Sequence, residues 1–215
     1  MLVNKNSSFE IYAVLISTLG IELRGIAITY EVTSKYIDRL SNNSTWYDET
    51  RSRSENKYEM KNFGSAVMGM KNFLKEMTIL SLAKVIEDLR YDARKLFGLK
   101  LDFWSDYTPP IPYHTELKKM YHLSNVIKHN RGLIERKSSE SSKYLVDVEG
   151  FENGEPMIYS DIDYRSLIFY CDYALADIIG RITGLEHHNF PDDLNQSIND
   201  FYNDIVPESF NDISE

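Results

Sequence analysis

The sequence contains a single cysteine, Cys171, in 215 residues. One thiol cannot build a disulfide framework, and it excludes a zinc site made of several cysteines. A chain with so little cysteine is typical of a reducing compartment, so we expect a cytoplasmic location.

Long hydrophobic runs are also missing. The uncharged stretch Ile11–Ile21 covers only eleven residues and is followed by Glu22 and Arg24. A membrane-spanning helix needs about 20 apolar residues, so we expect a buried core helix here and no membrane span. The start of the chain does not show a charged segment, an apolar core and a small-residue cleavage site in order, so no signal peptide is expected.

Basic residues are absent from the end of the chain. The last one is Arg181, and eight acids follow it, whereas the part through Arg181 has a net charge of −1. We therefore expect a domain over 1–184 and an acidic tail over 185–215. Within the domain, segment 116–143 carries seven basic residues against three acids. It is either a phosphate-facing site, which the tail would shield, or a solvated surface.

Hydrophobic residues make up 42% of the chain, which is enough for a packed core. Helical periodicity predicts a mainly α-helical bundle of about five helices. We expect helices over Phe9–Leu40, over about 57–97 as two helices or one kinked helix, over His114–Asn130 and over Asp161–Thr183. Apolar residues of the tail, such as Phe201 and Tyr202, favour a short docked helix.

Two details of this pattern bear on the architecture. Met60, Phe63, Met70 and Met77 belong to a stripe with spacings of three and four, which we interpret as core. Residues Tyr144–Val148 alternate between apolar and other side chains, and the Asn153-Gly154 turn signal and Pro156–Tyr159 follow. This order predicts a small β-hairpin over about 143–160, after the helix that ends near Asn130.

One face of the helix over His114–Asn130 collects polar side chains. At 100° per residue, Lys118, His122, Asn125 and His129 fall within a sector of roughly 60°. A histidine can move a proton from or to the oxygens of a ribose phosphate, and nearby cations can stabilise the growing charge. Such chemistry requires no metal and no cofactor. The bland alternative is an exposed polar face that ends in a helix cap.

The run Ser124-Asn125-Val126-Ile127-Lys128-His129-Asn130-Arg131-Gly132 resembles the HEPN superfamily (higher eukaryotes and prokaryotes nucleotide-binding). Its members are α-helical bundles, and many are metal-independent endoribonucleases of toxin–antitoxin, phage-defence and RNA-processing systems. Their motif is an arginine, four to six residues, then a histidine, often with a polar residue directly after the arginine. His129 matches the histidine and Asn125 matches the polar residue.

The arginine position of that motif holds Ser124, which offers no charge to a phosphate. The resemblance implies that His129 is the general acid or base, that Asn125 orients the phosphate or the imidazole, and that Lys128 or Arg131 neutralises charge. Lys118 and His122 would complete an RNA-binding face. We expect weak or absent ribonuclease activity, which Ser124→Arg would partly restore.

Two function classes therefore remain open. One is an RNA- or nucleotide-directed module of a bacterial or phage defence or toxin-type system. The other is a non-catalytic homodimeric scaffold or protein-interaction module. A metal site is a weaker alternative, because His187-His188 and Asp192-Asp193 are separated by Pro191 and adjacent histidines point in different directions.

Overall fold

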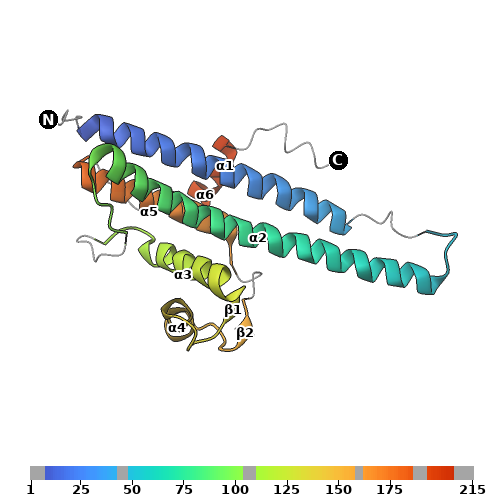
Figure 1. The fold of residues 1–215 in the computed structure, drawn as a ribbon. Coiled ribbons are helices and arrows are strands. Elements are labelled where there is room, and N and C mark those ends of the chain that lie inside the picture. The colour runs from blue at the N-terminus through green and yellow to red at the C-terminus, as the bar shows by residue number, and fades with distance from the viewer. Residues whose placement is uncertain (1–7, 43–47, 104–109, 158–161, 186–192, 206–215) are drawn as a thin grey trace.

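The computed structural model describes residues 8–42, 48–103, 110–157, 162–185 and 193–205. Two long helices, α1 (Ser8–Asn42) and α2 (Arg53–Phe97), run antiparallel to each other, as Figure 1 shows. α5 (Tyr164–Thr183) packs against both of them, and α3 (His114–Asn130) packs against α2 and α5. The mainly α-helical bundle expected from the sequence is confirmed.

α2 is a single helix, so of the two alternatives suggested by the phase shift in its periodicity, two separate helices are excluded. It begins earlier than expected because Ser52 and Glu55 form a capping box, in which each side chain receives the other residue's backbone N–H. It ends at Gly98, whose positive φ of 68° lets the chain turn away and satisfy the last carbonyls.

The N-terminal half of α2 extends past α3 and α5, and α1 packs against one side of it (Figure 1). Met60, Phe63, Met70 and Met77 are therefore exposed, and interpreting this stripe as core was wrong. Before Thr78, only Asn56 and Val67 of α2 are as deeply buried as the residues of the C-terminal half. Helical spacing shows that apolar residues share a face, but it does not show whether another element covers that face.

A small two-stranded antiparallel sheet follows α3. Its strands are β1 (Leu133–Ile134) and β2 (Glu155–Pro156), with Leu133 opposite Pro156. The predicted hairpin is thus present, but its first strand lies before 143 and not at 144–148. Of the expected return strand, Pro156 lies in β2 and Tyr159 lies outside the described residues.

The segment expected to be that first strand is the helix α4 (Glu140–Asp147). Ser139 caps this helix by accepting a hydrogen bond from the backbone of Ser142 at 3.1 Å. Leu145 is fully buried in a small core with Leu123 and Ile134. The cap and this packing outweigh the strand preference of alternating Tyr and Val residues, which is a weak local signal.

α5 is the most deeply buried helix among the described residues. Asp163 caps its start and Gly184, with φ of 71°, ends it. The carboxylate of Asp177 is buried and accepts a hydrogen bond of 2.6 Å from Nε of Arg181. The same guanidinium donates to the carbonyl of Pro110, so this ion pair also fixes the chain that enters α3.

The tail folds into α6 (Leu194–Ile205), as its apolar residues suggested. Ile198, Tyr202 and Ile205 are buried in the main core, and the helix packs against α1 and α5. The guanidinium of Arg165 lies 4.4 Å from the centre of the Tyr202 ring. Residues 193–205 are therefore part of the bundle and do not shield segment 116–143.

α1 is both long and apolar. It is the one helix of the described residues that is long and apolar enough to cross a membrane, and 22% of its most apolar window is buried. A core helix or a signal sequence near the N-terminus meets the same criteria, so this is weak evidence for a span.

Candidate functional site

α3 brings the predicted polar residues onto one side of the bundle. Leu117, Met120, Leu123 and Val126 bury the opposite side of the helix, which fixes its rotation. The polar side meets α4, which lies across it (Figure 1). What α3 offers to a ligand therefore depends on how much of this side α4 leaves open.

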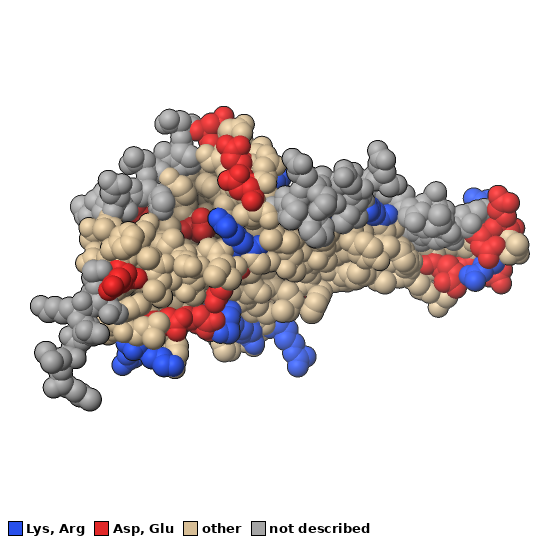
Figure 2. Space-filling view, turned by 90° about the horizontal axis from the view of Figure 1, so that it is seen from above, with Lys and Arg blue, Asp and Glu red and all other residues tan. Residues whose placement is uncertain are grey.

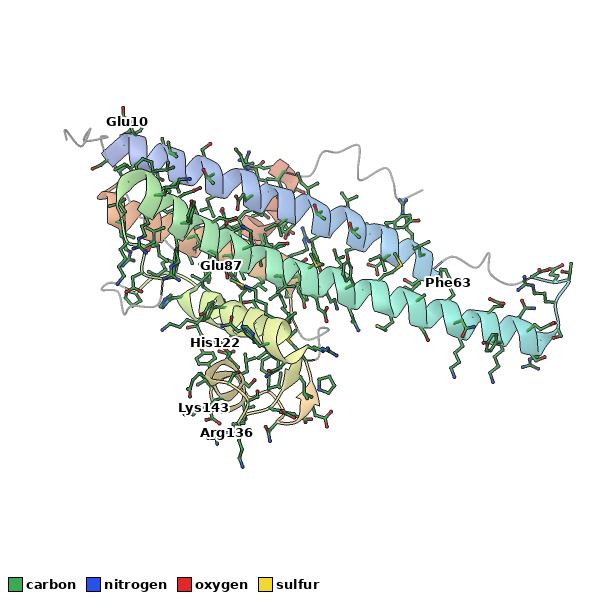
Figure 3. The ribbon with its side chains drawn as sticks, in the orientation of Figure 1. Glu10, Phe63, Glu87, His122, Arg136 and Lys143 are labelled. Atoms are coloured by element: carbon green, nitrogen blue, oxygen red, sulfur yellow. The ribbon has the colours of Figure 1, made fainter. Side chains whose placement is uncertain are left out.

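His122 lies between α3 and α4 (Figure 3). Its ring stacks on Tyr144 with centroids 4.1 Å apart, and Nδ1 lies 3.1 Å from the hydroxyl oxygen of Ser141. Burial lowers the pKa of His122, with Lys118 acting in the same direction and Glu149 opposing it. The neutral imidazole is thus held as part of the packing between two helices.

Asn125 is engaged in the same contact. Its amide nitrogen donates to the hydroxyl of Ser141 at 3.2 Å. Asn130, one turn further on, donates to Ser142 at 3.2 Å. A row of serines at the start of α4 therefore binds three polar side chains of α3, including that of His122.

His129 is exposed at the end of α3, where α4 does not cover it. It follows His122 by seven residues, which is on the order of 10 Å along a helix. The two imidazoles therefore share a face without sharing one reaction site. On the exposed part of this face, His129 is therefore the one imidazole that can act as an acid or a base.

The cations predicted around His129 differ in their availability. Nζ of Lys128 forms an ion pair of 2.9 Å with Glu87 of α2. Arg131 is exposed and ends α3 in the left-handed conformation, with φ of 53°. Lys118 lies half-buried three turns before Arg131, so it does not belong to the same cluster.

Ser124 is only 1% exposed, and its hydroxyl donates to the backbone carbonyl of Tyr121 at 2.8 Å. An arginine at this position would have to displace core side chains or bury its charge. The expectation that Ser124→Arg restores activity is therefore abandoned, because the position does not face solvent.

The serines of α4 contact the polar side of α3, although they were not among the residues predicted for it. Ser141 and Ser142 are buried, and they connect α4 to His122, Asn125 and Asn130. The Ser138-Ser139-Glu140-Ser141-Ser142 run was the available signal, since Ser139 with the following acid is a helix start. Lys143 of α4 and Arg136, which precedes α4, lie at the outer edge of the molecule (Figure 3). Arg136 pairs there with Asp147 of α4.

A metal site is not found within the described residues, where no three His, Cys, Asp or Glu side chains form a group that could hold an ion. Of the weaker candidate ligands, His187, His188 and Asp192 lie outside the described residues. Two further acids of α2 are ion-paired: Glu87 with Lys128, and Asp88 with Lys84 one turn before it.

A groove of about 640 Å³ lies between α1 and α2, on the other side of the bundle from α4. Its walls include Gly25, Ile26, Leu74, Met77 and Val85, and its rim carries Glu22, Lys84 and Asp88. Burial and the neighbouring carboxylate of Asp88 raise the pKa of Glu22. The groove continues into the exposed apolar side of α2.

Figure 2 shows charged residues gathered at the far tip of α2, where Arg51 pairs with Asp48 and Glu59.

Comparison of the chain with protein-family models, with curated proteins and with solved structures finds no match.

Proposed function

We propose that this protein is a non-catalytic, homodimeric scaffold that works through helix-to-helix contacts. The observation that carries the proposal is the exposed apolar side of α2, on which Met70, Phe73 and Met77 are each more than 40% exposed. Large contiguous apolar surface is uncommon on a protein that works alone, and it typically marks an interface.

The polar side of α3 also supports the scaffold proposal, because it is poorly equipped for catalysis. Ser141 of α4 binds both His122 and Asn125, so these side chains are already used in the packing of the fold. Ser124 is buried and carries no charge. A phosphate bound near His129 would therefore lack the ring of donors that makes acid–base cleavage fast.

Light scattering at micromolar concentration tests the scaffold function. A mass near twice 25.1 kDa, together with no RNA cleavage, is the expected result. A monomer at high micromolar concentration would refute it, because scaffolding by self-association needs at least two copies.

A second candidate is an RNA-directed module of a defence or toxin-type system, as the resemblance to HEPN proteins implies. The specific observation in its favour is that His129 and Arg131 are both exposed at the end of α3, within the basic segment 116–143. His129 would transfer the proton, and Arg131 or Lys128 would neutralise the phosphate.

RNA cleavage in the presence of a metal chelator tests this second function. If it holds, the protein releases fragments with 2′,3′-cyclic phosphate ends, and His129→Ala removes the activity. His122→Ala serves as the comparison, because His122 lies under Tyr144 and not at the exposed end of α3. Cleavage that survives His129→Ala would show that His129 is not the acid–base group.

A further inference from the structure

Exposed apolar side chains follow one edge of α2, which we call the α2 seam. Phe73 is 64% exposed, Met70 is 41% exposed and Met77 is 42% exposed. Alternating intervals of three and four residues give a helix a continuous edge that fits a second helix. The seam at these intervals comprises Phe63, Ala66, Met70, Phe73 and Met77, which are exposed, and Leu80, which is half-buried.

The α2 seam has a charge of opposite sign at each end. Glu59 stands four residues before its first member and Lys84 four residues after its last. Both side chains are exposed, 55% for Glu59 and 66% for Lys84. The seam therefore carries a carboxylate at one end and an ammonium at the other, which within their own chain also contact Arg51 and Asp88.

This charge pattern is complementary to itself in one orientation only. We propose that two copies of the chain pair their α2 seams antiparallel about a two-fold axis, a proposal that rests on the scaffold function above. Each apolar layer then joins different seam positions of the two copies, and both ends of the interface gain an ion pair. The layers are Glu59 with Lys84, Phe63 with Leu80, Ala66 with Met77 and Met70 with Phe73.

Other pairings of the same edge are less favourable. A parallel pairing in register places Glu59 against Glu59 and Lys84 against Lys84, and like charges at such positions repel. An antiparallel pairing shifted by seven residues sets Glu59 against Met77, or Lys84 against Ala66 in the other direction. Both shifts desolvate a charge against an apolar side chain.

The shape of the molecule leaves room for this partner. The overlap from Glu59 to Lys84 spans on the order of 40 Å of helix. In Figure 1 the N-terminal half of α2 extends beyond α3 and α5, so a second α2 can approach it along its length. The groove beside Leu74, Met77 and Ser81 follows the same edge and can receive side chains of the partner.

Two matched variants of α2 test whether the seam is the interface. Met70→Glu places a charge in the centre of the seam and is expected to weaken dimerisation at least about tenfold. Met68→Glu is the control, because Met68 is 58% exposed on the same helix but points away from the seam. Circular dichroism confirms that both variants fold, and sedimentation gives the dissociation constants. Equal effects of the two variants on the dissociation constant would overturn the proposal that the seam is the interface.

Cysteine cross-linking tests the register. The double variant Ala66→Cys with Met77→Cys is expected to form covalent dimers under mild oxidation, because each thiol faces the other position of the partner. Either single variant is expected to stay uncross-linked, and Cys171 does not interfere since it is buried. Cross-linking of the single variants would indicate parallel pairing and overturn the proposal.

The outcomes also separate this inference from the scaffold function. A dimer that withstands Met70→Glu and gives no cross-link uses another surface, which overturns the seam and leaves the scaffold function intact. A native protein that remains monomeric overturns both.

Discussion

The ring of His122 stacks on that of Tyr144 at 4.1 Å and so joins α3 to α4. An imidazole can act as a general base, but in this stack the ring of His122 contributes to the packing of the fold. Its neutral form is favoured because burial lowers the pKa of His122. This contact decides that the face of α3 works first as a packing surface.

Stability is expected to fall with acid because of this histidine. The folded pKa of His122 lies below its ordinary value of about 6.5, so between the two values the unfolded chain binds more protons. The stabilising effect is complete above pH ~6.5, is lost as the pH falls toward the folded pKa, and levels off below it. His122→Gln should therefore flatten the dependence of the unfolding midpoint on pH between about 5 and 7.

The exposed His129 provides the control for that measurement. His129→Gln keeps the His122 contact and should leave the slope close to that of the native protein. Equal flattening by both variants would show that the contact with Tyr144 is not the source of the pH dependence. Thermal melts by circular dichroism over this pH range provide the data.

Ser124→Arg is expected to destabilise the fold. The position is 1% exposed, so the guanidinium would be buried without an acidic partner, at a cost of about 3–5 kcal/mol. Ser124→Ala loses only the hydrogen bond to Tyr121 and should cost about 1 kcal/mol. Urea unfolding measures both values, and an unchanged midpoint for Ser124→Arg would contradict the burial of this side chain.

Swapping the charges at the ends of the α2 seam should weaken and then restore the dimer. Glu59→Lys removes the attraction to Lys84 of the partner and is expected to raise the dissociation constant about threefold to tenfold, most strongly at low salt. Adding Lys84→Glu in the same chain should recover most of the affinity. Because Glu59 also pairs with Arg51 and Lys84 with Asp88 of the same chain, a thermal melt must accompany the measurement. No recovery in the double variant would contradict the register.

Tyr202 should anchor α6 to the bundle. The side chain is buried beside Arg165, so Tyr202→Ala is expected to cost about 3 kcal/mol of unfolding free energy. Asn203→Ala is the matched control, since Asn203 is exposed on the same helix. A similar small effect of both variants would mean that α6 does not contribute to the core.

The thiol of Cys171 should be inert in the folded protein. Burial raises the pKa of this thiol, so the reactive thiolate is scarce at neutral pH. A chromogenic disulfide reagent is expected to react within minutes in denaturant and far more slowly in the native protein. Equal rates in the two conditions would show that α5 opens readily.

The sequence by itself determined the helices and most of their ends. Capping is local chemistry, so Gly98 and Gly184 mark the ends of α2 and α5 without reference to the rest of the chain. The spacing of the apolar residues in α5 predicts that the helix packs against others, and the helix is buried as predicted. Local signals failed at 144–147, where alternating residues became α4.

Only the tertiary structure decided which faces are covered. The spacing of Met70 and Met77 resembles that of the α5 stripe, yet these side chains are exposed because they lie on a side of α2 that α1 does not cover. The polar face of α3 looked open in sequence, yet Ser141 and Tyr144 of α4 cover its centre. Periodicity is a property of one helix, whereas burial depends on what packs against it, and that is set by contacts between distant parts of the chain.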